Sequence, residues 1–127
     1  MGYNIGMVSL GCAKNQTDAE TMLGILASRG HRLVAEPENA DVIVVNTCVF
    51  IESAKQESID TILEMAEYKK GRCRLLIASG CLAERYHDEI MNELPELDAV
   101  VGTGDYDKIA DVIDKAFGGE RPNLSGH

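Results

Sequence analysis

Short apolar runs alternate along the chain with longer stretches of helical periodicity. The runs of strand length are rich in β-branched residues and cover 3–10, 31–34, 41–47, 74–79 and 99–101. The longer stretches repeat apolar residues three and four positions apart and predict helices over 17–29, 51–68, 83–94 and 106–117. This alternation is typical of an α/β fold with a mostly parallel sheet and helices on both faces.

Local signals set the expected boundaries of the helices. Thr17 and Glu20 have the spacing of a capping box, and Gly30 suits a left-handed C-cap, so these residues bracket the first helix. The apolar stripe expected to face the core from the second helix is Ile59, Ile62, Leu63 and Ala66. The polar segment 118–127 is predicted to be a linker, which leaves residues 1–117 as the domain.

Length and charge narrow the range of functions. The chain of 127 residues is long enough for one domain with a core, and its net charge is −9. Nucleic-acid binding draws most of its affinity from Lys and Arg on phosphates, so this charge argues against RNA or DNA as a direct partner. Neither a leader sequence nor an apolar run near the roughly 20 residues of a membrane span is visible. We therefore expect a cytoplasmic protein that does not bind a membrane.

Three cysteines occupy equivalent places in this pattern. Cys12, Cys48 and Cys81 each come just after a strand-like run and before a helix-like stretch. If the strands are parallel neighbours, all three thiols emerge at the edge where open α/β sheets bind their ligands. Helix N-termini nearby would favour the thiolate, which is the form that binds metal. A lone cysteine is more simply a small buried hydrophobe, but three equivalent positions favour a shared metal site.

The remaining cysteine and the histidines fit this site less well. Cys73 precedes the strand-like run that leads to Cys81, and at ~3.3 Å per residue it would lie on the order of 25 Å from the other thiols. We therefore predict a partly buried bystander without a function. The histidines are interpreted as ordinary surface residues; they are His31, His87 and His127.

The donor set favours iron–sulfur chemistry. Structural zinc sites usually close with four ligands, often in short Cys-x-x-Cys pairs, and the sequence contains no such pair. Iron–sulfur clusters accept widely spaced cysteines, and three ligands would leave one iron of a [4Fe–4S] cluster open. A zinc-binding or redox-thiol module without enzymatic activity is the alternative.

Polar residues beside the cysteines have two interpretations. Their hydrogen bonds to cluster sulfides would tune a cluster, whereas ordinary capping and solvation explain them equally well; the residues are Lys14, Asn15, Asn46, Thr47 and Ser79. The sequence contains no phosphate-binding glycine motif after a strand and no Gly-x-Ser-x-Gly nucleophile motif.

The segments around the cysteines resemble a known family. They are Ser9-Leu10-Gly11-Cys12-Ala13-Lys14-Asn15 with Asp18-Ala19-Glu20, Asp41-Val42-Ile43-Val44-Val45-Asn46-Thr47-Cys48, and Ala78-Ser79-Gly80-Cys81. These segments resemble the motifs of the methylthiotransferases, radical S-adenosylmethionine enzymes that insert sulfur and a methyl group into unactivated C–H bonds. The resemblance covers nearly the whole chain and includes all three cysteines.

The residues that follow the first two cysteines indicate a branch of this family. Cys12-Ala13-Lys14-Asn15 and the segment 48–60 resemble the RimO branch, which modifies an aspartate of ribosomal protein number twelve of the small subunit. The tRNA-modifying MiaB branch usually has Gln-Met-Asn after the first cysteine and Val-Arg-Glu after the second, and neither occurs here. A tRNA adenosine methylthiotransferase is kept as the alternative.

The resemblance implies a division of labour between domains. Cys12, Cys48 and Cys81 would bind an auxiliary [4Fe–4S] cluster whose open iron holds the sulfur destined for the β-carbon of the substrate aspartate. The family's Cys-x-x-x-Cys-x-x-Cys motif, which binds a second [4Fe–4S] cluster that cleaves S-adenosylmethionine, is absent from this sequence.

We therefore expect a flavodoxin-like or Rossmann-like three-layer sandwich that is the amino-terminal domain of such an enzyme. It would hold no catalytic residue of its own and would be inactive alone. Its expected partners are the radical domain, joined through the linker 118–127, and the ribosomal protein substrate.

Overall fold

Six strands form one all-parallel sheet in the computed structural model, which describes residues 3–9, 13–34, 36–47, 52–80, 92, 94, 96–101, 108–118 and 123–124. The strands are β1 (Asn4–Ser9), β2 (Arg32–Val34), β3 (Val42–Thr47), β4 (Leu75–Gly80), β5 (Ala99–Val101) and β6 (Asn123–Leu124). Their order is β2-β1-β3-β4-β5-β6, and every neighbouring pair is parallel. The first five strands thus have the order of flavodoxin-like doubly wound sheets, and the expected fold class is confirmed.

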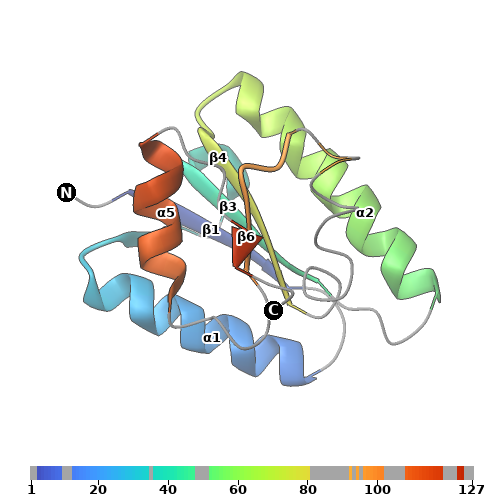
Figure 1. The fold of residues 1–127 in the computed structure, drawn as a ribbon, viewed down its shortest axis with the longest axis horizontal. Coiled ribbons are helices and arrows are strands. Elements are labelled where there is room, and N and C mark those ends of the chain that lie inside the picture. The colour runs from blue at the N-terminus through green and yellow to red at the C-terminus, as the bar shows by residue number, and fades with distance from the viewer. Residues whose placement is uncertain are drawn as a thin grey trace.

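Helices cover both faces of the sheet (Figure 1). Residues of α1 (Ala13–Ser28) and α5 (Ile109–Phe117) share a core cluster on one face, and α2 (Glu52–Ala66) packs on the other. Two short 3₁₀ helices are also present, η1 (Pro37–Asn39) and η2 (Glu67–Lys70). Among the helices of the described residues, none has the length and apolarity that crossing a membrane requires.

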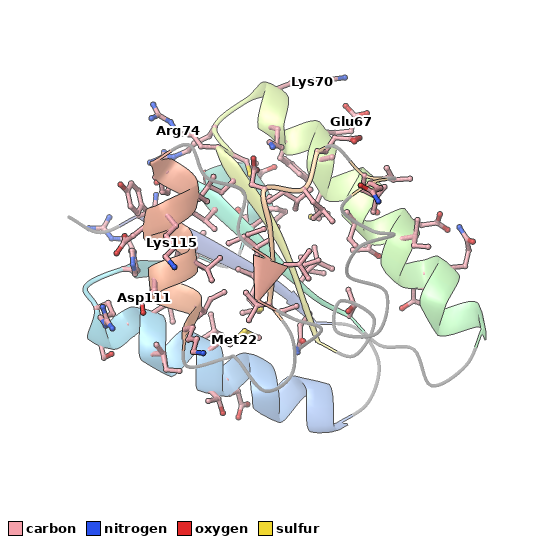
Figure 2. All side chains as sticks on the ribbon, viewed as in Figure 1. Met22, Glu67, Lys70, Arg74, Asp111 and Lys115 are labelled. Carbon is pink, nitrogen blue, oxygen red and sulfur yellow. The ribbon has the colours of Figure 1, made fainter. Side chains whose placement is uncertain are left out.

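The strand β3 supplies both halves of the core. Val42 and Val44 belong to the cluster beneath α1 and α5, whereas Ile43 and Val45 belong to the cluster beneath α2. Side chains alternate between the two faces of a strand, so a continuous apolar run suits a strand with helices on both sides. Figure 2 shows Met22 on the side of α1 that faces the sheet, where it is fully buried.

Several details differ from the sequence-based expectation. Helix α1 begins at Ala13, four residues before the predicted capping box, because 13–16 are mostly good helix formers that extend the helix backwards. Leu63 is 43% exposed. Among the side chains of α2 that the structure describes, Ile62 and Met65 are buried, three residues apart on the sheet-facing side.

Two further predictions concern the segment 83–94 and the expected linker 118–127. The predicted helix 83–94 falls almost entirely outside the described residues. Asn123 and Leu124 pair with β5 as strand β6, so the sheet extends into the segment predicted to be a linker. The division of the chain at residue 118 stays a prediction.

Carboxylates tie the strands together at the amino-terminal edge of the sheet. Asp41, just before β3, accepts hydrogen bonds from the Asn4 backbone N–H (3.0 Å) and from Arg72 Nε (3.1 Å). Asp98, just before β5, accepts from Lys69 Nζ (2.6 Å) and from the Leu76 backbone N–H (2.9 Å). Charged groups thus link β1, β3, β4 and β5 at this edge.

His31 is a structural residue rather than an ordinary surface histidine. Its Nδ1 accepts a hydrogen bond from the Tyr3 backbone N–H (3.1 Å), and its ring stacks on Tyr3, which in turn stacks on Phe117. Burial lowers the pKa of His31 below its ordinary value, although the charge of Asp114 acts in the opposite direction. The neutral imidazole is therefore the form that the fold accommodates. His87 and His127 lie outside the described residues.

The environment of His31 predicts that the fold loses stability under mild acid. With its folded pKa lowered, the unfolded chain binds the proton more readily, so stability falls as the pH drops through the ordinary value of 6.5. Thermal unfolding measured from about pH 7.5 to about pH 5, a range that brackets the histidine titration, checks this loss. The variant His31→Asn keeps an acceptor near the Nδ1 position without a titrating group and should show a shallower pH dependence. Parallel curves for the two proteins would contradict the assignment.

Candidate functional site

The strands that precede the three cysteines are neighbours in the sheet and end together. β1 lies beside β3, and β3 lies beside β4. Ser9 at the end of β1 is the register partner of Asn46, and Thr47 at the end of β3 is the partner of Gly80 at the end of β4. The three strands therefore stop within one residue of one another at the carboxyl edge of the sheet, the lower right in Figure 1.

The predicted ligands themselves lie outside the described residues; they are Cys12, Cys48 and Cys81. The structure describes the chain up to Thr47 and Gly80, the residues that precede the second and third of these cysteines, and describes it again from Ala13, directly after the first. For Lys14 and Asn15 it describes the helical backbone but not the side chains. The candidate site is thus built here from the strand ends that lead into it.

The helices that follow β1 and β3 in the chain lie on opposite faces of the sheet. The connection after β1 enters α1, and the connection after β3 enters α2 on the other face (Figure 1). Such a reversal is the topological switch point, at which doubly wound sheets bind their ligands outside the carboxyl ends of the strands. The described ends of β1 and β3, Ser9 and Thr47, therefore lie on the two sides of the switch point.

Buried hydroxyl groups join β3 to β4 at this edge. The Thr47 hydroxyl donates to the backbone carbonyl of Ser79 at 2.6 Å, and Ser79 Oγ donates to Asn46 Oδ1 at 3.4 Å. All three residues have no exposed surface. A hydroxyl carries a single proton, so in this arrangement Thr47 and Ser79 donate within the sheet rather than to a ligand.

Gly80 allows the ends of β3 and β4 to approach closely. Its φ is +94°, in the left-handed region that favours glycine. A Cβ at this position would lie 2.5 Å from the Thr47 carbonyl oxygen and 2.7 Å from Asn46 Oδ1. A side chain would therefore meet both an unfavourable backbone conformation and the neighbouring strand, one residue before Cys81.

The described strand ends at the carboxyl edge carry no charged side chains, unlike the amino-terminal edge with its carboxylates. The described residues that end β1, β3 and β4 are all uncharged: Ser9, Asn46, Thr47, Ser79 and Gly80. Helix α1 has no acidic residue in its first turn, so the partial positive charge of its N-terminus is not offset there. Anionic ligands such as thiolates would meet no carboxylate among these residues.

Cys73 lies at the opposite edge, as expected. It precedes β4, is 3% exposed, and its Sγ donates to the Leu75 carbonyl at 3.1 Å. Burial raises the pKa of the Cys73 thiol, which favours the protonated form over the thiolate that binds metal. Its predicted position is confirmed, but it is fully rather than partly buried, because its thiol packs in the core cluster beneath α2. That it has no function stays a prediction.

The fold and this edge define the class of protein: a flavodoxin-like α/β domain with a candidate ligand site at the switch point between β1 and β3. Residues 4–102 match the model of family UPF0004, which is described as an uncharacterized protein family. The chain belongs to this family.

Curated relatives cover nearly all of the chain. Proteins named ribosomal protein uS12 methylthiotransferase RimO are 53% identical over 98% of the chain in Thermoanaerobacter sp. and 56% identical over 92% in Acetivibrio thermocellus. A relative of the same name in Lachnoclostridium phytofermentans is 58% identical over 92% of the chain. The chain spans 28%, 26% and 27% of the length of these relatives, so it corresponds to about a quarter of each.

The sequence did not reveal two features of the site. Strand order is needed to locate the switch point, and a mostly parallel sheet is compatible with several orders. The bond from Thr47 to Ser79 depends on β3 and β4 being neighbours, so local pattern could not predict it. The only local signal was a short run of hydroxyl and amide residues at the ends of otherwise apolar strands.

The close approach at Gly80 predicts an unusually costly substitution. Gly80→Ala should destabilise the fold by about 2–5 kcal/mol, because the left-handed penalty of roughly 1–2 kcal/mol adds to about 1–3 kcal/mol for the steric displacement of β3. Gly30→Ala is the matched control, since Gly30 has a similar φ of +89° but nothing within 4 Å of the position that a Cβ would occupy. It should cost only the left-handed penalty. Equal losses of unfolding free energy in urea titrations would show that the approach to Thr47 carries no cost.

Proposed function

We propose that the chain is the cluster-binding domain of a methylthiotransferase that modifies ribosomal protein uS12. In this proposal Cys12, Cys48 and Cys81 each supply one thiolate to an auxiliary [4Fe–4S] cluster. The observation that carries the proposal is the common ending of β1, β3 and β4 at one edge, because each of these strands leads directly into one of the cysteines.

Chain connectivity supports a shared site for two of the thiols. Single peptide bonds join Thr47 to Cys48 and Gly80 to Cys81, and Thr47 and Gly80 are register partners. With ~3.8 Å between consecutive Cα atoms and ~4.8 Å between strands, the two cysteine Cα atoms are at most about 12 Å apart. Both thiols therefore start from the carboxyl edge.

The chemistry of the donor set also fits the cluster. Thiolates are the ligands that iron–sulfur clusters take, and widely spaced cysteines are acceptable to them. When bound by three cysteines, such a cluster supplies one iron that can carry the sulfur to be transferred. The cysteines would bind and orient it, and the described strand ends place no carboxylate beside the thiolates.

The substrate and the other domains are proposed from the relatives. The three relatives described above all bear the uS12 name, which favours the ribosomal protein over a tRNA as the substrate. On this basis we propose that the whole enzyme acts in the cytoplasm. A radical domain with a second [4Fe–4S] cluster would cleave S-adenosylmethionine and generate the substrate radical, while residues 1–117 present the sulfur.

Reconstitution of the chain tests the ligand assignment. Anaerobic incubation with iron and sulfide should give one cluster, about four irons and four sulfides per chain. Alanine at Cys12, Cys48 or Cys81 should abolish stable binding, because each removes one of three ligands. Iron and labile-sulfide analysis, together with visible absorption, measures the content.

Cys73→Ala is the control for these variants. It removes a thiol from the opposite edge and should leave the cluster content unchanged. Full content in the Cys12, Cys48 and Cys81 variants would refute the ligand assignment. Bound zinc without labile sulfide in the unsubstituted chain would instead indicate a structural metal module.

The substrate assignment requires the full-length enzyme. Incubated with S-adenosylmethionine, a reductant and a sulfide source, it should replace one hydrogen of uS12 by a methylthio group. The resulting mass increase should be located on an aspartate by fragmentation. An unmodified transfer RNA mixture is the matched alternative substrate. Methylthiolated adenosine in the RNA, with unmodified uS12, would reverse the assignment.

A further inference from the structure

The last residue pair of β3 and β4 is held by more than the sheet's backbone hydrogen bonds. The Thr47 hydroxyl reaches across to the Ser79 carbonyl at 2.6 Å, in a fully buried position. The next residue, Gly80, has a φ of +94°. The Thr47 carbonyl oxygen occupies the space that a Cβ on Gly80 would need. A side-chain bond and a glycine contact therefore coincide at the point where both strands end.

The Thr47 bond and the Gly80 backbone together fix how the chain ends β3 and β4. The bond from Thr47 holds the Ser79 carbonyl, and with it the orientation of the peptide that leads into Gly80. The left-handed backbone of Gly80 then sets the direction in which the chain continues. The same Thr47 is one peptide bond from Cys48, so a single side chain links the exits toward both cysteines.

We propose that Thr47 is a positioning residue, whose hydroxyl bond to the Ser79 carbonyl fixes the backbone exits of β3 and β4 and thereby the spacing of the Cys48 and Cys81 thiols around a bound cluster. This inference rests on the proposed function. It assigns no ligand role to Thr47, since the hydroxyl proton is engaged with Ser79. It deepens the proposal by naming what holds two of the three ligands in place.

The position of Thr47 allows its hydroxyl and its methyl group to be tested separately. It follows Ile43 and Val45 at alternate positions of β3, both in the cluster beneath α2. Thr47→Val keeps the volume and removes the hydroxyl, whereas Thr47→Ser keeps the hydroxyl and removes the methyl group. A role in positioning should follow the hydroxyl, whereas a role in core packing should follow the methyl group.

The 127-residue chain and its variants, reconstituted anaerobically with iron and sulfide, provide the test. In Thr47→Val, iron should be lost to a competing chelator about tenfold faster, the change expected for one buried hydrogen bond. The electron paramagnetic resonance spectrum of the reduced cluster should also change, because the ligand spacing is altered. Thr47→Ser should stay within about twofold of the unsubstituted chain and keep its spectrum.

A matched control removes a comparable bond at the other end of β4. Cys73→Ala eliminates the donor to the Leu75 carbonyl and should lower the melting temperature of the cluster-free chain without affecting iron loss or the spectrum. A Thr47→Val variant with a lower melting temperature but an unchanged spectrum and iron-loss rate overturns the inference. It would leave the ligand assignment standing.

Two other outcomes are also decisive. If Thr47→Val does not fold, Thr47→Ser carries the test, and rapid iron loss or an altered spectrum in that variant overturns the inference. If the unsubstituted chain takes up no cluster, both the proposed function and this inference fail. If the cysteine variants lose the cluster while Thr47→Val keeps the iron-loss rate and the spectrum of the unsubstituted chain, the inference alone is overturned.

Discussion

The burial of β3 is the constraint on which the rest of the domain depends. All six of its residues are buried, and its apolar side chains feed the core on both faces. Each buried Val or Ile contributes roughly 1.5–3 kcal/mol relative to an exposed one. A slip of one residue would exchange the faces of every side chain and separate the Thr47 hydroxyl from the Ser79 carbonyl to which it donates. Since β1 and β4 pair with this strand, its register also fixes where they end.

The two edges of the sheet are held by different chemistry. At the amino-terminal edge, Asp41 and Asp98 join the strands through charge-assisted hydrogen bonds to backbone and to Arg72 and Lys69. At the carboxyl edge, neutral hydroxyl groups do so through Thr47. The net charge of −9 therefore says little about the site itself. Carboxylates hold the amino-terminal edge, whereas the described strand ends at the carboxyl edge carry no charged side chain.

The sequence predicted the strands of this fold better than its helix ends. Continuous β-branched runs identify buried strands because few other structures bury them so fully. The start of α1 was predicted less accurately, because helix-forming residues from Ala13 onward extend the helix before the capping signal at Thr17. The two-residue strand β6 gave no periodic signal, and His31 showed no sign of its contact with Tyr3, which comes from 28 residues away.

The site was predicted as a set of residues but not as an arrangement. Three cysteines after three strand-like runs pointed to one edge, and the order of the strands brings those runs side by side. The features that hold the strand ends, the Thr47 hydroxyl and the contact at Gly80, are interactions between strands. They depend on register and order, which a local pattern does not contain.

The short strand β6 ends at the carboxyl edge of the sheet. Because it is parallel to β5, the chain at Leu124 travels toward the same edge at which β1, β3 and β4 end. At ~4.8 Å per strand, the end of β6 lies on the order of 15 Å from the end of β3. The carboxyl edge of the sheet therefore holds both the proposed site and the end of β6.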